Sequence, residues 1–593
     1  MNSRRRECAF VAALAAAFAC FTWRGLTMFF SDDDVMNMYK AWMTPASDII
    51  KGLLLPWTPV LRPAGTAIYR VIYELFGFRP LPLHVFCWLL LIGNVFVAWR
   101  FFRALAPPLV AVLATALTLV HGTFQDLYLN AGTVYDQLCF LFTALAVTAY
   151  VRGGRWSGVW TCVFCLLAID SKESGAVVPL VLFLYECVYH WRDLNRERIR
   201  TVALVYAVLI AMEAALVIGR IPGTSDLAGT AEYHVHFHFS VWMEHIAAYF
   251  SMLAYQRVTF SAAAAGFVLI AMAVLALLLR NRAMLFGWLF FLVAVTPVAL
   301  IAPRLGYVLY VPLPGLGLWA ASLFPAEGFT LRQTAAAGVI ASVILLVHAR
   351  HWPHAWNVHE SSEWRLSNSM LRSSPTMKPA ARILFADDFS MDNGYDSLFN
   401  LRLLYHDPRI EVARLKGSAA EQPDGGLYDH VFTTAWDGYA ELDRKNPGAS
   451  LRLHILRDFR PGLGFDTRRR DCIAYPVSGL LPADRPGEGW WTTRSASLKF
   501  EPPPAGSTLA LSYWVPEFVA AAPRNLTVTV GGELAGTAAL NRAGENKLEL
   551  PVPADGRTDY GFTIVRLDVD HPYMKDGQEY GVVLLRAGFG TNP

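Results

Sequence analysis

The first 350 residues are dominated by apolar segments, and these limit the folds open to the chain. A helix that crosses a bilayer needs about 20 predominantly apolar residues. The chain of 593 residues is 54% hydrophobic and only 17% charged, which is too apolar for an average soluble protein. We therefore predict a polytopic α-helical membrane protein with about eleven transmembrane helices, at residues 9–30, 84–104, 107–123, 134–151, 156–170, 174–190, 201–220, 258–279, 284–301, 306–323 and 333–350.

Cationic side chains recur in every second loop between these segments. Cytoplasmic loops are enriched in Lys and Arg, so the pattern predicts a cytoplasmic N-terminus in a membrane of the bacterial inner-membrane type. An odd number of spans then places the C-terminal part outside the cytoplasm. The arginines that set this orientation are Arg4, Arg5, Arg6, Arg100, Arg103, Arg152, Arg155, Arg192, Arg196, Arg198, Arg200, Arg280, Arg282 and Arg332.

The composition changes near residue 351, after the last apolar segment. Polar residues then predominate, and short alternating stretches separated by Gly and Pro are typical of strands in a β-sandwich. We predict four parts: a transmembrane domain at 1–350, a linker at 351–380, an α/β domain at 381–475 and an antiparallel β-sandwich at 476–593.

Three consecutive carboxylates, Asp32, Asp33 and Asp34, directly follow the first apolar segment. Charge beside low-dielectric lipid is costly, which favours a role in chemistry or ion binding. Alternatively, the carboxylates cap a short helix on the membrane surface, where acidic side chains suit the positive end of the helix dipole. These three residues alone leave both interpretations open.

Further charged residues fall on the same predicted side of the membrane. The loop at 31–83 contains Arg62 and two amphipathic stretches, 35–43 and 68–76, which predict short helices on the membrane surface. Acids and bases that converge on one membrane face indicate a shared cavity. The others at outer span ends include Asp136, Lys172, Glu173 and Arg304.

These features resemble the GT-C superfamily of polyprenol-dependent glycosyltransferases, which includes protein O-mannosyltransferases and aminoarabinose transferases. The most telling element is an acidic pair in the first outer loop, which Asp33-Asp34-Val35-Met36-Asn37-Met38-Tyr39 matches. The resemblance covers about residues 1–350 and implies a GT-C-like fold. Further matching pieces are Leu61-Arg62-Pro63, Phe76-Gly77-Phe78-Arg79-Pro80, Ser171-Lys172-Glu173 and Arg304-Leu305-Gly306-Tyr307.

The resemblance implies an inverting transfer of a sugar from a polyprenyl-phosphate-linked donor at the outer surface. Asp33 would be the base that deprotonates the acceptor, and Asp34 would orient the acceptor or bind a divalent cation. Family members differ in metal dependence, so we predict no particular metal or cofactor. Fixed positive charge for the leaving phosphate would come from Arg62, Lys172 and Arg304, with Asp32, Glu173, Asp136 and Tyr307 in supporting positions.

Two other classes of function stay open at this point. A transporter or lipid flippase would show paired halves with buried charges near the middle of the membrane. A non-catalytic anchor would serve a carbohydrate-binding sandwich, in which Trp490, Trp491, Tyr513 and Trp514 either stack on sugars or fill the core. The expected partners are membrane lipids, the lipid-linked sugar and a lipid, glycan or protein acceptor. A net charge of +3 argues against nucleic acid.

Overall fold

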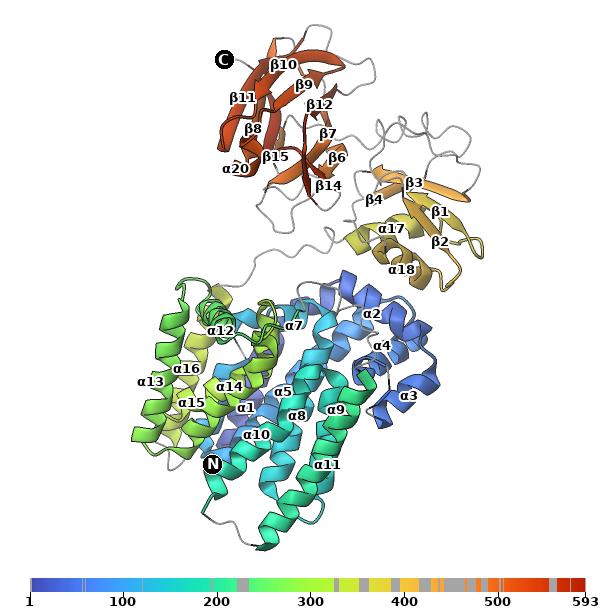
Figure 1. Ribbon diagram of the computed structural model, residues 1–593. Coiled ribbons are helices and arrows are strands. Elements are labelled where there is room, and N and C mark those ends of the chain that lie inside the picture. The colour runs from blue at the N-terminus through green and yellow to red at the C-terminus, as the bar shows by residue number, and fades with distance from the viewer. Residues whose placement is uncertain are drawn as a thin grey trace. The chain divides into compact units, whose positions relative to one another are not determined.

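The structure is a computed structural model, and its chain divides into two compact units, Met1–Trp356 and Asn357–Pro593. The first unit is almost entirely helical, and the second is rich in β-structure (Figure 1). The residues described are 3–591 except 56, 59, 120, 193–195, 221–233, 325–329, 351–361, 386–394, 415–427, 436–437, 442–463, 467–475, 482–488, 501–502, 505, 554–562 and 576–577.

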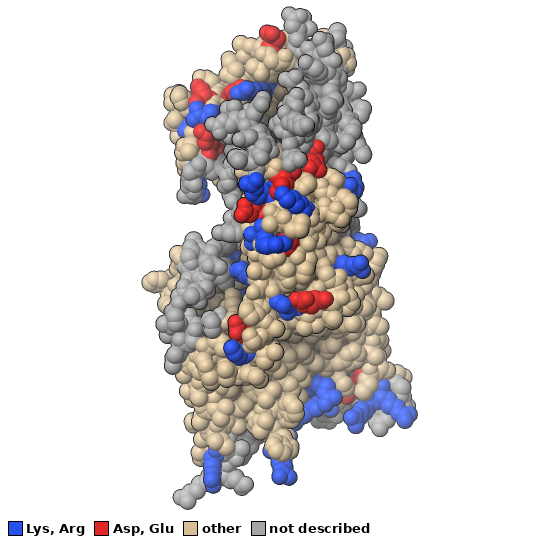
Figure 2. All heavy atoms as spheres, turned by 90° about the vertical axis from the view of Figure 1, so that its right-hand side faces the viewer, with Lys and Arg blue, Asp and Glu red and all other residues tan. Residues whose placement is uncertain are grey.

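Within the described residues, four helical segments are long and apolar enough to cross a membrane, and a bent pair of helices adds a fifth. This confirms a membrane protein, whereas the count of eleven spans stays a prediction. On the face in Figure 2, the helical unit shows a broad band with few charged side chains. The four segments are Arg4–Thr27, Pro80–Leu105, Ala131–Arg152 and Arg282–Ala299, and the bent pair is Pro108–Leu119 with Gly122–Leu129.

The remaining apolar helices of this unit are shorter or bounded by breaks. One break, predicted around residues 170–173, separates α9 from α10: α9 ends at Ser171, and a 3₁₀ turn, Glu173–Val177, precedes α10. The long helices of the unit are α1 (Ser3–Thr22), α5 (Pro80–Leu105), α6 (Pro108–Leu119), α8 (Val134–Arg152), α9 (Ser157–Ser171), α10 (Val178–Tyr185), α11 (Arg196–Arg220), α13 (Ala262–Leu278), α14 (Arg282–Ala299), α15 (Leu313–Ala321) and α16 (Leu331–Arg350).

The loop at 31–83 folds into three short helices, α2 (Asp32–Met43), α3 (Ala46–Leu54) and α4 (Pro63–Phe76). Two of them, α2 and α4, confirm the helices predicted from the amphipathic stretches. They lie near α7 (Asp126–Leu129) at the end of the bundle opposite the N-terminus (Figure 1). A further short helix, α12 (Phe239–Leu253), has its own aromatic side chains packed against the end of α14.

The second unit begins with a four-stranded mixed sheet in the order β2-β1-β3-β4. Strand β1 pairs in parallel with both β2 and β3, and β3 pairs antiparallel with β4. Its elements are β1 (Arg382–Phe385), α18 (Tyr395–Leu404), β2 (Glu411–Arg414), β3 (His430–Ala435) and β4 (Gly438–Glu441). The sheet and α18 give this region mixed α/β structure.

Part of the segment predicted as a linker is helical. Residues 362–373 form α17 (Ser362–Ser373), whose Leu366 and Met370 are buried in the core of the mixed sheet. These two residues lie four positions apart, so they occupy one face of the helix. The other side chains of α17 are mostly polar, and this narrow apolar stripe gave the segment the composition of a linker.

The strands beyond residue 464 form one antiparallel sheet, in the order β10-β9-β12-β7-β15-β8-β11, with β5 beside β15 and β6 beside β7. Because β15 pairs with both β7 and β8, the strands form a continuous hydrogen-bonded sheet rather than the two separate sheets of the predicted sandwich. They are β5 (Gly464–Asp466), β6 (Pro476–Leu481), β7 (Trp490–Phe500), β8 (Ser507–Val515), β9 (Asn525–Val530), β10 (Glu533–Ala539), β11 (Gly544–Pro551), β12 (Thr563–Val569) and β15 (Val583–Thr591). A short helix, α20 (Glu517–Ala520), follows β8, and the hairpin β13 (Tyr573–Lys575) and β14 (Gln578–Tyr580) pairs separately.

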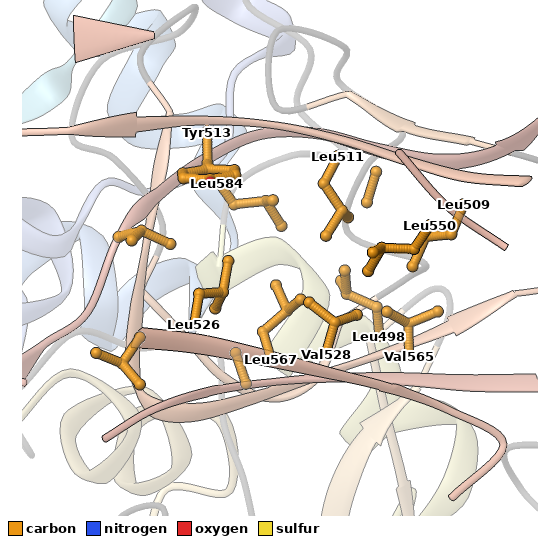
Figure 3. Packing of buried hydrophobic residues seen from close by; sticks show 14 of the residues in the cluster. Leu498, Leu509, Leu511, Tyr513, Leu526, Val528, Leu550, Val565, Leu567 and Leu584 are labelled. Carbon is orange, nitrogen blue, oxygen red and sulfur yellow. The ribbon is translucent and has the colours of Figure 1, made fainter. Parts of the chain in front are cut away.

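The core of this sheet lies between two groups of its strands. In Figure 3, Leu511, Tyr513 and Leu584 of β8 and β15 face Leu526 and Leu567 of β9 and β12. Alternate residues of β8 are buried, as expected of a strand with one face on a core. The alternation in the sequence of β8 is thus matched by alternate burial along the strand.

Candidate active site

The acidic stretch begins α2 and caps it. Ser31 is the N-cap residue, and its hydroxyl accepts from the Asp34 backbone N–H at 3.2 Å. In return, Asp34 Oδ2 accepts from the Ser31 backbone N–H at 2.9 Å, which completes a capping box. Two of the orphan donors at the start of the helix are thereby satisfied, so the capping interpretation holds for Asp34.

Asp34 is fully buried, and its other oxygen is also engaged. Tyr69 Oη of α4 donates to Asp34 Oδ1 at 2.8 Å. Burial raises the pKa of the Asp34 carboxyl to about 6, although the bonds from Ser31 and Tyr69 oppose that rise. Burial also raises the pKa of the Tyr69 hydroxyl well above its usual range, so Tyr69 remains a hydrogen-bond donor. Asp34 therefore ties α2 to α4.

Asp33, the residue before Asp34, is exposed. The Cβ of Asp33 lies close to Gly132, in the turn before α8. The approach is so close that a Cβ added at Gly132 would lie 3.1 Å from Asp33 Cβ and 2.9 Å from Asn130 Oδ1. Asn130 Oδ1 accepts from the Gly132 N–H at 2.8 Å and lies 2.9 Å from Ser31 Oγ. Asp32 is exposed as well. The Cβ of Asp33 is therefore packed against this turn, while its carboxylate faces solvent.

Arg62 is the N-cap residue of α4 and adopts a left-handed conformation, with φ of 51° and ψ of 55°. For a residue other than Gly, this conformation is uncommon and costs about 1–2 kcal/mol. The guanidinium binds Glu173 with two parallel bonds, Nε to Oε1 at 3.1 Å and Nη2 to Oε2 at 2.8 Å. It also lies 5.3 Å from the centre of the Tyr135 ring. Arg62 thus combines a strained backbone conformation with two defined side-chain contacts, to Glu173 and to Tyr135.

Lys172 lies in the break between α9 and the following 3₁₀ turn. Its Nζ is 2.6 Å and 2.7 Å from the two oxygens of Asp136 at the start of α8, and 5.2 Å from the centre of the Tyr307 ring. The backbone at Lys172 is extended, and successive side chains of an extended chain point to opposite sides. This explains how Lys172 and Glu173 reach different partners.

Two tyrosines connect the acidic stretch to these ion pairs. The rings of Tyr69 and Tyr135 lie 6.0 Å apart. Tyr69 binds Asp34, and Tyr135 lies under Arg62 and precedes Asp136. A continuous series of contacts therefore runs from the start of α2 to Lys172 and Tyr307.

Arg304 is connected to this series through Tyr307, three residues further on in the 3₁₀ turn Gly306–Tyr310. Its backbone N–H donates to Tyr249 Oη of α12 at 3.4 Å. The structure therefore brings Arg62, Lys172, Glu173, Asp136 and Tyr307 together by direct contacts. Arg304 lies two residues before the 3₁₀ turn that contains Tyr307.

Tyr69, Asn130 and Tyr135 were not predicted as site residues from the sequence. A capping signal was available, because Ser31 and Asp34 have the spacing of a capping box. Asn130-Ala131-Gly132 likewise has the composition of a tight turn. Tyr135 gave no comparable signal, since an aromatic residue at the start of an apolar helix is ordinarily a core residue.

The described residues offer poor ligands for a cation. They contain no group of three His, Cys, Asp or Glu side chains placed to hold a metal ion, and both Asp34 oxygens already accept hydrogen bonds. A role for Asp34 in binding a divalent cation therefore does not fit these contacts.

The fold and site define a class of protein: a helical membrane protein with paired charged residues at one end of its bundle and a β-rich C-terminal unit. No family model and no curated protein matches the sequence. Several solved structures do match, and they are glycosyltransferases of the GT-C superfamily, the superfamily that the sequence motifs resemble.

Three of these structures show the extent of the likeness. ArnT from Cupriavidus metallidurans, bound to undecaprenyl phosphate, is 13% identical, with a TM-score of 0.37 over 69% of this chain and 86% of that one. The mycobacterial arabinofuranosyltransferase AftD is 11% identical, with a TM-score of 0.37 over 99% and 61%. The Archaeoglobus fulgidus oligosaccharyltransferase is 9% identical, with a TM-score of 0.43 over 98% and 96%.

Proposed function

We propose that this chain is an inverting glycosyltransferase that moves a sugar from a polyprenyl-phosphate-linked donor to an acceptor on the extracytoplasmic face of the membrane. The proposal rests on the difference in environment between Asp33 and Asp34. One carboxylate is buried and fixes the start of α2, and the adjacent one is exposed on that fixed support. A general base needs such a rigid mount and open access to substrate.

In the proposed reaction, Asp33 accepts the proton of an acceptor hydroxyl or amine as its oxygen or nitrogen attacks the anomeric carbon. The bond between that carbon and the phosphate oxygen breaks, and the polyprenyl phosphate leaves with the electron pair. Attack from the face opposite the leaving group inverts the anomeric centre. Asp34 fixes the first turn of α2, which carries Asp33. The acceptor is a lipid, a glycan or a protein.

The leaving phosphate is stabilised by fixed positive charge. Arg62 is the best-placed cation, because its ion pair with Glu173 is partly exposed, at 21% and 45% of the two side chains. A phosphate can replace Glu173 on the guanidinium fork with the same bidentate geometry. Lys172 and Asp136 are only 14% and 5% exposed, so Lys172 contributes its charge while it remains paired. Arg304 supplies a third cation beside Tyr307.

Substitution of the aspartates one at a time tests this proposal. Each variant is purified in lipid nanodiscs, and release of polyprenyl phosphate is measured with a set of polyprenyl-phosphate sugars. Asp33→Asn should lower kcat about 10²- to 10⁴-fold, the usual contribution of a general base, with little effect on the unfolding temperature. Asp32→Asn is the matched control, since Asp32 is exposed in the same turn of helix.

Undiminished transfer by Asp33→Asn would remove this residue from catalysis, and loss of transfer in Asp32→Asn alone would move the base by one position. Movement of an intact lipid-linked sugar across liposomes, with no bond cleaved, would instead favour the transporter or flippase.

A further inference from the structure

Four aromatic residues in the C-terminal sheet were candidates for stacking on sugars, and the structure separates them. Tyr513 is 4% exposed and belongs to the core. Trp490 and Trp491 pack against that core, and Trp491 also contacts Tyr580 at 5.2 Å between ring centres. Trp514 is different, because 48% of it is exposed on the outer face of β8. An indole exposed on a sheet face is available to a ligand.

The strands beside β8 surround Trp514 with polar groups. In the β8–β11 register, Glu545 lies opposite Trp514, and Lys547 lies opposite Ser512. On the other side, Arg586 of β15 lies opposite Ser512 of β8 and also opposite Asp466 of β5. Side chains directly opposite each other in an antiparallel pair are neighbours on one face. Two rows therefore cross this outer face, one with Lys547, Ser512 and Arg586 and one with Glu545 and Trp514.

A shallow hollow of about 170 Å³ lies within this group of residues. Ser512, Glu545, Lys547, Leu585 and Arg586 line it. Ser512 Oγ donates to Glu545 Oε1 at 2.9 Å, which fixes the carboxylate. The β8–β15 register shifts between Leu584 and Arg586, and such a bulge re-aims the side chains beside it. The hollow thus combines a carboxylate acceptor, a hydroxyl and two cationic side chains. Trp514 does not line it, but lies opposite Glu545 in the adjacent row.

We infer that this outer face of β11, β8 and β15 binds a sugar unit of a glycan. A sugar ring has an apolar face of C–H groups, which packs on an aromatic ring, and a rim of hydroxyls, which need both donors and acceptors. Trp514 supplies the platform, Glu545 accepts, and Lys547 and Arg586 donate. This site is separate from Asp33 and belongs to the C-terminal unit alone.

Glycan binding to the full-length protein in nanodiscs tests the inference. The probes are immobilised mannan, arabinan and polygalacturonate, and binding is followed by biolayer interferometry. At least one probe should bind, and Trp514→Ala should weaken that binding about 10-fold, as loss of a central aromatic contact does. A Ser512→Ala, Lys547→Ala double variant should weaken it too.

Leu534→Ala is the control, because Leu534 is 61% exposed on β10 at the other end of the sheet. It should change binding less than about 2-fold, since surface residues outside a contact have little effect. Asp33→Asn should bind normally, which separates this inference from the catalytic proposal. Failure of all three glycans to bind, or equal binding by wild type and Trp514→Ala, would overturn the assignment.

Discussion

The ion pairs of the candidate site differ from an ion pair on the large sheet of the C-terminal unit. In the helical unit, Lys172 binds Asp136 across 36 positions of sequence, and Arg62 binds Glu173 across 111. In the C-terminal unit, Arg566 binds Asp568 two positions away, and the two side chains are 55% and 33% exposed. The Lys172–Asp136 pair joins separate helices in a poorly solvated setting, and Arg62–Glu173 joins separate elements while partly exposed. The Arg566–Asp568 pair lies along a single strand and is exposed.

The difference follows from the surroundings of each charge. Water screens the charges of an exposed ion pair, so the loss of one of them changes the stability little. A buried charge without its partner pays a large desolvation penalty, so the partner must be brought to it. The buried Lys172–Asp136 pair therefore fixes α8 against the α9–α10 break. The partly exposed Arg62–Glu173 pair connects α4 to the same break.

The largest expected effect comes from breaking the most buried pair. Lys172→Met leaves Asp136 charged and buried, and should destabilise the protein by about 3–5 kcal/mol. Unfolding monitored in detergent measures this loss. The double variant Lys172→Met, Asp136→Leu should recover most of it, because an apolar pair replaces the ion pair. A single variant as stable as wild type would show that this pair does not fix the helices.

An intermediate effect concerns the pH dependence that Asp34 gives the fold. Its folded pKa is about 6 against 3.8 unfolded, so folding favours the protonated form. The contribution is fully present below pH 3.8 and is lost as the pH rises through 6, by roughly 3 kcal/mol for a shift of about two units. Asp34→Asn cannot titrate, so its unfolding temperature should fall less than that of wild type between pH 4 and 7. Parallel curves for the two proteins would refute this account.

The smallest effect is expected at the exposed pair of the C-terminal unit. Arg566→Ala should change the free energy of unfolding by less than about 1 kcal/mol, and salt should have little further influence on the variant. Denaturant titration of wild type and variant at low and high salt measures both quantities. A loss as large as that of Lys172→Met would remove the contrast between the two units.

Local patterns in the sequence predicted the parts of this fold that depend on local physics. A long apolar run specifies a membrane helix, and alternation specifies a strand with one buried face, so α5 and β8 were predicted near their observed bounds. The strand order depends instead on contacts between distant segments. Nothing local to β15 indicates that it lies between β7 and β8. Alternation therefore predicted strands that face a core, but not the continuous pairing that joins them.

The candidate site divides in the same way. The acidic stretch and the cations were visible as unusual charges beside apolar segments. The pairing of these charges could not be predicted, because the contact of Arg62 with Glu173 depends on how α4 packs near the break after α9. The distinct roles of Asp33 and Asp34 follow from where α2 begins, since a shift of one residue would exchange the buried and exposed carboxylates.

The pairing order of the large sheet ends at β11, and an end strand presents unpaired backbone groups to which another chain can add. Along β11 the outward residues Glu545, Lys547 and Glu549 alternate in charge sign. A second copy of this strand would have to bring these charges into register before its backbone could bond. The same side chains that border the hollow thus protect the domain from aggregating edge to edge.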